Sequence, residues 1–227
     1  MQHNFNTLFS LIESMTKIKN IIFDLGGVIL NLDYSKTVEE FNKIGFFNFE
    51  KVYNQKKQSK IFDDFEKGEI SNDKFIALIQ QSEKLKIDEN DFINAWNAML
   101  LEIPKERIEF IKKLKKDYNI FLLSNTNEIH IKKFEADLRK KKLLKDFQNC
   151  FEQIYYSSNM GMRKPNEDCF IKIIEDHNLI AHETLFIDDS IQHIEGAKKV
   201  GINAFLLKKE NTILQLVPDI IQSEHHK

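Results

Sequence analysis

The feature that most constrains the fold is a series of short, largely apolar runs, most of them closed by a polar residue. The first run spans residues 20–23 and ends at Asp24, which a Gly26-Gly27 pair follows. Similar runs span residues 120–123, 153–156, 185–187 and 204–207. A continuous apolar run of this length is typical of a strand that is buried on both faces, as in a parallel sheet.

Helical patterns separate the later runs. Apolar residues recur at helical spacing over 108–114 and 170–177, and the segment 191–200 ends at Gly201, which suits a helix stop. Strand and helix therefore alternate from about residue 106 to 208. This alternation predicts an α/β fold with a doubly wound, Rossmann-like parallel sheet.

One interval breaks the alternation. Between Tyr34 and Pro104 no strand-like run occurs, and four amphipathic stretches span residues 36–44, 51–67, 72–83 and 89–101. Gly68 can end the second stretch, and Ser71 can cap the third. The interval therefore predicts an all-helical cap domain inserted into the α/β core.

The expected domain boundaries follow from these patterns. The core takes residues 15–33 and 105–210, and the cap takes residues 34–104. Residues 1–14 form an N-terminal extension, with Met15 as an alternative start, and residues 211–227 form a C-terminal tail.

Composition excludes several classes of protein. Lys and Arg total 33 and Asp and Glu total 35, so the chain lacks the basic excess of a nucleic-acid binder. No apolar run approaches the roughly 18 residues that would span a bilayer, and the first fourteen residues lack the charged start of a secretory signal. Two cysteines, Cys150 and Cys169, are too few for a disulfide framework and are expected to be buried free thiols. We therefore expect a cytoplasmic protein with neither nucleic acid nor membrane as a partner.

Polar residues follow three of the predicted strands. They are Asp24, Ser124 and the pair Asp188-Asp189. The carboxyl ends of parallel strands meet at one edge of the sheet, where open sheets bind ligands. Clustered carboxylates repel one another unless a cation neutralises them, and an all-oxygen ligand set favours Mg²⁺. We therefore predict a Mg²⁺ site here, although one of the paired carboxylates could instead cap the helix that begins near Ser190.

Two further features suit a phosphate. The segment 124–126 precedes a helix that starts near Asn127, and a hydroxyl with backbone N–H groups at a helix start binds anions. Ordinary helix capping is the alternative for these residues. Lys164, which Pro165 biases toward an extended conformation, can offer a fixed positive charge. A solvated surface lysine is the alternative there.

The order of these motifs resembles a known superfamily. Asp24-Leu-Gly-Gly-Val28, Ser124-Asn125, Lys164-Pro165 and Asp188-Asp189 resemble the four motifs of the haloacid dehalogenase-like hydrolases. The helical block resembles the cap of the first subclass, and segments 65–71 and 160–165 resemble the branch that contains α-D-glucose-1-phosphate phosphatases. The resemblance implies a Mg²⁺-dependent phosphatase that hydrolyses a small phosphomonoester, a sugar phosphate such as glucose 1-phosphate.

The resemblance also implies catalytic roles. Asp24 would be the nucleophile that forms an aspartyl-phosphate, which water then hydrolyses. Ser124 and the Asn125 backbone would hold phosphoryl oxygens. Lys164 would pair the charge of the phosphate and keep Asp24 ionised.

The implied metal ligands are Asp24, the backbone carbonyl of Gly26, Asp189 and Asp188, the last either directly or through water. Gly26 is also a departure from the family pattern, because most phosphatases of the superfamily carry a second Asp there as general acid and base. Other members of the resembled branch also have Gly at this position. Water or a side chain from the cap would have to replace the missing proton donor.

Two other functions stay open. A metal-independent 2-haloacid dehalogenase also lacks the second Asp, but the Asp188-Asp189 pair argues against it. A non-catalytic member of the family would bind phosphorylated ligands or a protein partner through its cap, and Gly26 keeps that alternative open.

Two aromatic side chains complete the expectations. His193 lies close after the paired carboxylates, and a structural hydrogen bond is favoured over a place at the rim of the site. Trp96, in the last predicted cap helix, is expected in the core of the cap rather than facing a substrate.

Overall fold

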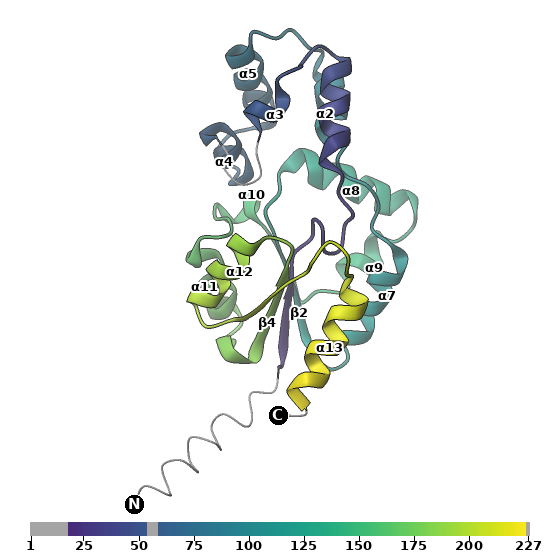
Figure 1. The fold of residues 1–227 in the computed structure, drawn as a ribbon, viewed down its shortest axis with the longest axis vertical. Coiled ribbons are helices and arrows are strands. Elements are labelled where there is room, and N and C mark those ends of the chain that lie inside the picture. Colours follow the sequence, from purple (N-terminus) through teal and green to yellow (C-terminus); the bar gives the residue numbers. More distant parts are fainter. Residues whose placement is uncertain (1–17, 54–58, 226–227) are drawn as a thin grey trace, which may run out of the picture.

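The computed structural model of the chain describes residues 18–53 and 59–225, and it has a sheet-centred core with a helical cap above it (Figure 1). The predicted N-terminal extension, residues 1–14, and the alternative start at Met15 lie outside the described residues. Within those residues, no helix combines the length and apolar character that a membrane crossing needs.

The core is built on a parallel sheet of five strands in the order β3-β2-β1-β4-β5. The strands are β1 Asn20–Phe23, β2 Asn119–Ser124, β3 Gln153–Tyr156, β4 Thr184–Asp188 and β5 Asn203–Leu206. Phe23 pairs with Leu122 on one side and with Ile187 on the other. Asp24 and Asp188 therefore emerge level with each other from neighbouring strands. The predicted parallel sheet is confirmed, because each apolar run was long enough for one buried strand and was closed by a polar residue or a turn.

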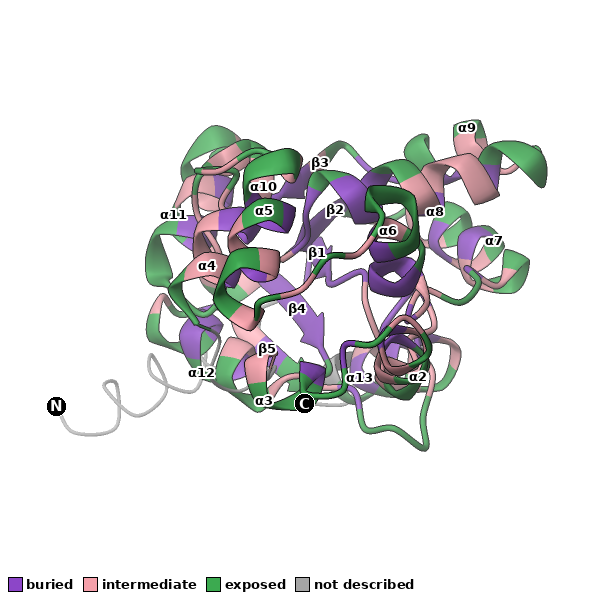
Figure 2. Ribbon diagram, turned by 90° about the horizontal axis from the view of Figure 1, so that it is seen from above, coloured by how far each residue is buried: buried purple, intermediate pink, exposed green. Residues whose placement is uncertain are grey.

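Helices cover both faces of the sheet, and its central strands β2, β1 and β4 are almost entirely buried (Figure 2). Apolar side chains of α7 Lys105–Leu114, α8 Glu128–Lys140, α9 Leu144–Gln148 and α13 Ile213–His225 pack with one face of the sheet. Those of α11 Glu167–Asp176 and α12 Ile191–Lys199 pack with the other face. Two short elements, α10 Ser157–Met160 and the 3₁₀ turn η1 Ala181–Glu183, complete the core.

The C-terminal segment differs from its prediction as a tail. Helix α13 occupies most of it, and Ile213, Val217 and Ile220 are buried in the same apolar cluster as Ile108 and Ile111 of α7. The spacing of four and then three residues places these side chains on one helix face. Pro218 lies inside the helix, and a proline in that place usually argues against a helix.

The cap is helical, as its amphipathic stretches predict. Its helices are α2 Tyr34–Lys43, α3 Phe49–Val52, α4 Lys60–Glu66, α5 Asn72–Glu83 and α6 Glu89–Asn97. Ser71 caps α5 by accepting a hydrogen bond from the Lys74 amide, and Gly68 takes a left-handed φ of 70° beyond α4. The single helix predicted over 51–67 is instead represented by α3 and α4, with residues 54–58 outside the described part of the chain.

Aromatic side chains fill the interior of the cap. The most deeply buried ones are Phe41, Phe46, Phe62, Phe75, Phe92 and Trp96. The predicted place of Trp96 in the cap core is therefore confirmed. Its indole ring also stacks on His130 of the core helix α8, with ring centroids 4.9 Å apart.

The chain enters and leaves the cap through a short antiparallel ribbon. Leu32 and Leu100 form a bridge, the Leu101 amide donates to the Asn31 carbonyl at 3.0 Å, and the Asp33 amide donates to the Met99 carbonyl at 2.9 Å. The two linkers therefore support each other, and this ribbon holds the cap over the carboxyl edge of the sheet.

Candidate active site

Asp24 lies at the carboxyl end of β1, where the sheet faces the cap. Its backbone amide donates to the Ile187 carbonyl at 3.0 Å, which extends the pairing of β1 with β4 by one residue. The residue is only 7% exposed, and its side chain lines a cavity of about 320 Å³ beneath the cap. A buried carboxylate in this place needs a counter-charge, and Lys164 supplies one.

Lys164 is completely buried, and its ammonium group bridges two carboxylates. The Nζ atom lies 2.7 Å from Asp24 Oδ1, 2.6 Å from Asp188 Oδ2 and 2.9 Å from the Leu123 carbonyl oxygen. Burial alone would lower the pKa of Lys164, but the carboxylates of Asp188 and Asp24 raise it well above its usual value. The alternative of a solvated surface lysine is therefore wrong. All three ammonium protons have acceptors, so a phosphoryl oxygen makes direct contact only by replacing one of them.

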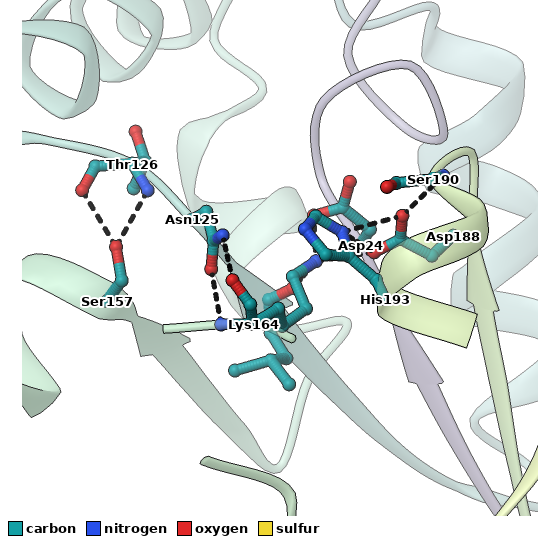
Figure 3. A network of polar contacts seen from close by, with 9 residues as sticks. Asp24, Asn125, Thr126, Ser157, Lys164, Asp188, Ser190 and His193 are labelled. Atoms are coloured by element: carbon teal, nitrogen blue, oxygen red, sulfur yellow. Dashed lines mark hydrogen bonds and ion pairs between the residues drawn. The ribbon is translucent and has the colours of Figure 1, made fainter. Parts of the chain in front are cut away.

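Asn125 fixes the loop that carries this lysine. Its side-chain Nδ2 donates to the Lys164 carbonyl at 2.9 Å, and its Oδ1 accepts from the Lys164 amide at 2.9 Å (Figure 3). The Asn125 side chain is thus committed to the loop, which leaves its backbone N–H as the group that can face a ligand. Ser124 lines the cavity beside it.

The segment after β2 leads directly into α8. Asn127 caps this helix by accepting from the His130 amide, and the preceding Thr126 amide donates to Ser157 Oγ at 2.9 Å. Both hydrogen bonds stabilise the turn between strand and helix. The sequence-based expectation of a polar turn at a helix start is met in this geometry, and such a turn suits an anion.

The three predicted acidic residues come together. Side-chain oxygens of Asp24, Asp188 and Asp189 all lie within 4.8 Å of one another. Burial, together with the charges of Asp188 and Asp189, raises the pKa of Asp24 to about 7. Partial desolvation and the charge of Asp188 raise the pKa of Asp189 to about 6. A hard cation with oxygen ligands would remove this repulsion, so the donor set fits Mg²⁺.

Asp188 and Asp189 differ in their surroundings. Asp188 Oδ1 accepts from the Ser190 amide at 2.8 Å, and both of its oxygens lie 3.0 Å from His193 Nδ1 (Figure 3). Burial alone would raise the pKa of Asp188, but Lys164 and His193 lower it to about 2. Asp189 is the exposed member of the cluster and lines the cavity. The hydrogen bond favoured for His193 is thus present, and His193 also lines the cavity.

Gly27 has a role that the sequence reasoning missed. It takes a left-handed φ of 73°, and a Cβ atom there would lie 2.1 Å from Asp189 Oδ2. Only a glycine permits this conformation and this close approach of the carboxylate. The Gly-Gly pair directly after a strand was the available signal.

Gly26 meets a different neighbour. A Cβ atom there would lie 2.8 Å from Leu32 Cδ1, the mobile end of a side chain from the cap linker. Gly26 lines the cavity together with Leu32. An apolar group therefore lies beside the position at which the family pattern places its second Asp.

The cap closes the cavity from above. Tyr34, Tyr53 and Glu66 line it from the cap, and Arg163 lines it from the loop before Lys164. The sequence reasoning gave none of these four residues a role, although Glu66 and Arg163 lie in the segments 65–71 and 160–165 that carry the resemblance. The cavity is thus bounded by acidic groups and the polar turn before α8 on the core side, and by hydroxyl-bearing and charged groups on the cap side.

Comparison with models of protein families identifies the family of this chain. Residues 18–201 match the model of the haloacid dehalogenase-like hydrolases. The chain belongs to this family. The match covers the whole cap and the core from β1 to the end of α12, and it stops before β5.

Individual relatives agree with the family assignment. A D-ribitol-5-phosphate phosphatase from Bacteroides thetaiotaomicron is 30% identical over 188 residues, which cover 83% of this chain and 91% of the relative. An aspartate-to-alanine variant of a haloacid dehalogenase family enzyme from the same organism, solved with magnesium and inorganic phosphate, has a TM-score of 0.80 and 33% identity. It covers 88% of this chain and 98% of its own. A predicted hydrolase of the family from Porphyromonas gingivalis has a TM-score of 0.79 and 30% identity, with 90% of this chain and 98% of its own covered.

Proposed function

We propose that this member of the family is a Mg²⁺-dependent phosphatase of small, polyhydroxylated phosphomonoesters, working through an aspartyl-phosphate on Asp24. The observation that carries the proposal is the buried Lys164 ammonium, which holds Asp24 beside Asp188 while Asp189 faces the same cavity. The 30% identical phosphatase of D-ribitol 5-phosphate supports this class of reaction.

In the first step, a carboxylate oxygen of Asp24 attacks phosphorus and an O–P bond forms. The bond from phosphorus to the ester oxygen breaks, and the leaving oxygen keeps the electron pair and takes a proton from water. Lys164 accepts no proton in this step, because its pKa lies far above neutrality. Its charge favours the ionised form of Asp24 and opposes the build-up of negative charge on the transferring group. Water then attacks the aspartyl-phosphate, which releases phosphate and restores the carboxylate.

The phosphate would lie at the turn between β2 and α8. Ser124 can donate its hydroxyl, and the Asn125 backbone N–H can donate to a second oxygen. The partial positive charge at the start of α8 adds to these contacts.

Asp24, the Gly26 carbonyl and Asp189 are the proposed metal ligands. Asp188 already accepts hydrogen bonds from Lys164, the Ser190 amide and His193, so we infer that it contacts the metal through water. Bound Mg²⁺ would neutralise the carboxylates and polarise the phosphoryl group.

The substrate class follows from the cavity and from the relatives. A cavity of about 320 Å³ accommodates a phosphate with a short sugar or polyol, and its cap side offers Tyr34, Tyr53 and Glu66 to hydroxyl groups. Glucose 1-phosphate, from the resemblance of the motifs, and D-ribitol 5-phosphate, from the named relative, are the two leading candidates.

The alternatives make different demands on the site. A metal-independent dehalogenase has no use for three carboxylates within 4.8 Å of one another. A non-catalytic binder would keep the phosphate turn without turnover. Mg²⁺-dependent release of phosphate in one assay would exclude both alternatives.

That assay measures phosphate release from both candidate esters and from p-nitrophenyl phosphate, with Mg²⁺ or with EDTA. We expect release with Mg²⁺ only, and we expect Asp24→Asn to lose nearly all of it while still binding inorganic phosphate. Asp33→Asn is the matched control, because Asp33 lies outside the cavity and caps α2 through the Ser35 amide. Full activity in EDTA, or an active Asp24→Asn variant, would contradict the proposal, and binding without release would support the non-catalytic alternative.

A further inference from the structure

The cap touches the core at a second place, away from the ribbon of linkers. Arg163 extends from the loop before Lys164 toward the cap helix α4. Its Nη1 lies 2.9 Å from Asp63 Oδ1, and its Nη2 lies 2.9 Å from Glu66 Oε2. The Arg163 and Glu66 side chains are mostly buried, so water screens this pair less than an ordinary surface ion pair.

Backbone contacts reinforce the same junction. The buried hydroxyl of Ser157 lies 2.6 Å from the Glu66 carbonyl oxygen, and it accepts from the Thr126 amide on the phosphate turn. A Cβ atom at Gly68 would lie 2.1 Å from the Ser158 carbonyl oxygen, so the chain beyond α4 lies directly against the core. We call this contact between residues 63–68 of the cap and 157–163 of the core the α4 junction.

The α4 junction and the ribbon lie on opposite sides of the cavity. In Figure 1, α4 lies above α10 on one side, and α2 with the linker that leads into it lies on the other side. The stack of Trp96 on His130 supports the cap near α8 as well. Without the α4 junction, the described contacts would hold the cap mainly along the side of the ribbon and α8.

We propose that Arg163 is a positioning residue that fixes the cap side of the substrate cavity. This inference rests on the proposed phosphatase function. The planar guanidinium can hold two carboxylates at once, which a lysine ammonium matches poorly. Arg163 thereby fixes Glu66, which lines the cavity, against a loop whose next residue holds the nucleophile.

The proposal separates two parts of a substrate. The phosphoryl group would contact core residues that the Asn125 side chain and the sheet hold without any contact to the cap. The leaving group lies toward the cap, so its binding depends on where α4 and Glu66 are held. Loosening the junction should therefore weaken binding of the leaving group and spare the phosphate.

The test compares KM for D-ribitol 5-phosphate with the inhibition constant of inorganic phosphate, both with Mg²⁺. For Arg163→Gln we expect KM to rise roughly tenfold or more, as for loss of a charged hydrogen bond, with the phosphate constant within about twofold of the parent. Arg163→Lys should recover part of the loss. Asp63→Asn, a milder change outside the cavity, should shift KM in the same direction by less.

The control is Arg139→Gln, which removes the same charge from an exposed position on α8 and should change neither constant. An equal loss of ester and phosphate binding in Arg163→Gln would overturn the proposal, because it would mean that the substitution displaces Lys164. An unchanged KM in both Arg163→Gln and Asp63→Asn would overturn it as well.

Hydrogen exchange distinguishes a failure of the proposed phosphatase function from a failure of the role proposed for Arg163. If the parent hydrolyses no phosphate ester, the phosphatase assignment fails. The amides of residues 60–68 should still exchange faster in Arg163→Gln than in Arg139→Gln if Arg163 holds the cap. Equal exchange in these two variants would refute the role of Arg163 without any assay of turnover.

Discussion

The Nζ atom of Lys164 lies 2.7 Å from Oδ1 of Asp24, although the two residues are 140 positions apart in the sequence. Both groups are buried, so each makes the charge of the other tolerable in a region that water barely reaches. The same ammonium binds Asp188 at 2.6 Å. The stability of the two buried carboxylates and the proposed chemistry of Asp24 therefore both depend on the Lys164 ammonium.

Lys164→Met should lower the free energy of unfolding by about 3–5 kcal/mol, because it leaves two buried carboxylates without their partner. It should also abolish turnover. Urea unfolding and phosphate release measure the two effects. Lys172→Met, which breaks an exposed ion pair with Asp176, should cost less than about 1 kcal/mol. A Lys164→Met protein as stable as the parent would contradict the assigned counter-charge.

Gly27→Ala should weaken Mg²⁺ binding, because its Cβ would collide with Asp189 Oδ2 at 2.1 Å. Gly45→Ala is the matched control, since Gly45 also has a positive φ, 89°, but has no atom within 4 Å of the added Cβ. Both variants should lose about 1–2 kcal/mol of stability from the left-handed backbone. Only Gly27→Ala should require more Mg²⁺ in a thermal-shift titration. Equal Mg²⁺ midpoints for the two variants would argue against Asp189 as a ligand.

Gly26→Asp should restore proton assistance to the leaving group, provided that Leu32 moves aside. General acid catalysis contributes typically about 10²–10⁴-fold where it operates. The parent should therefore cleave esters of acidic hydroxyls, such as glucose 1-phosphate, faster than glycerol phosphate. The variant should gain most on glycerol phosphate and least on p-nitrophenyl phosphate, because p-nitrophenolate leaves without taking a proton.

The measurement is kcat/KM for each ester in the parent, in Gly26→Asp and in Gly26→Asp combined with Leu32→Ala, which makes room for the carboxylate. A parent whose chemical step does not depend on the leaving group would show that another residue already supplies the proton.

His130 should make stability depend on pH. Burial lowers its pKa from 6.5 to about 4, and the neutral ring donates Nε2–H to the Trp96 carbonyl and accepts from Asn127 at Nδ1. The unfolded chain binds a proton below pH 6.5 and the folded chain does not until about pH 4. The contribution of His130 is therefore complete above pH 6.5 and falls by up to about 3 kcal/mol as the pH drops to 4.

Urea unfolding of the parent and of His130→Gln at several pH values isolates this effect, because other groups titrate equally in both proteins. The difference in unfolding free energy should be constant above pH 6.5 and should change below it. A difference that stays constant down to pH 4 would contradict the buried neutral imidazole.

The sheet and most of its helices could be predicted because their signals are local. An apolar run such as 20–23 is favourable only as a buried strand. Ser71 is recognisable in the sequence as a helix cap, and in the structure it accepts the Lys74 amide at the start of α5. Helix α13 was harder to predict, since Pro218 interrupts a short apolar stripe whose partners lie on α7. The break between α3 and α4 likewise has no local marker.

The candidate site divides in the same way. Asp24, Ser124, Asp188 and Asp189 could be named because each follows a predicted strand. The burial of Lys164 could not be predicted, because it depends on carboxylates far along the chain. Arg163 and Asp63 are 100 positions apart, and neither has a neighbour in the sequence that announces their ion pair.

Because Leu32 pairs antiparallel with Leu100, the cap is attached to the core like the loop of a very long hairpin. The entropy cost of closing a loop grows only with the logarithm of its length, so a larger cap between the two linkers would destabilise the core only slightly. The sheet edge with the proposed catalytic residues and the cap surface above it can therefore diverge independently. A different helical module inserted between these two linkers would lie above the same carboxylates and the same lysine at the sheet edge.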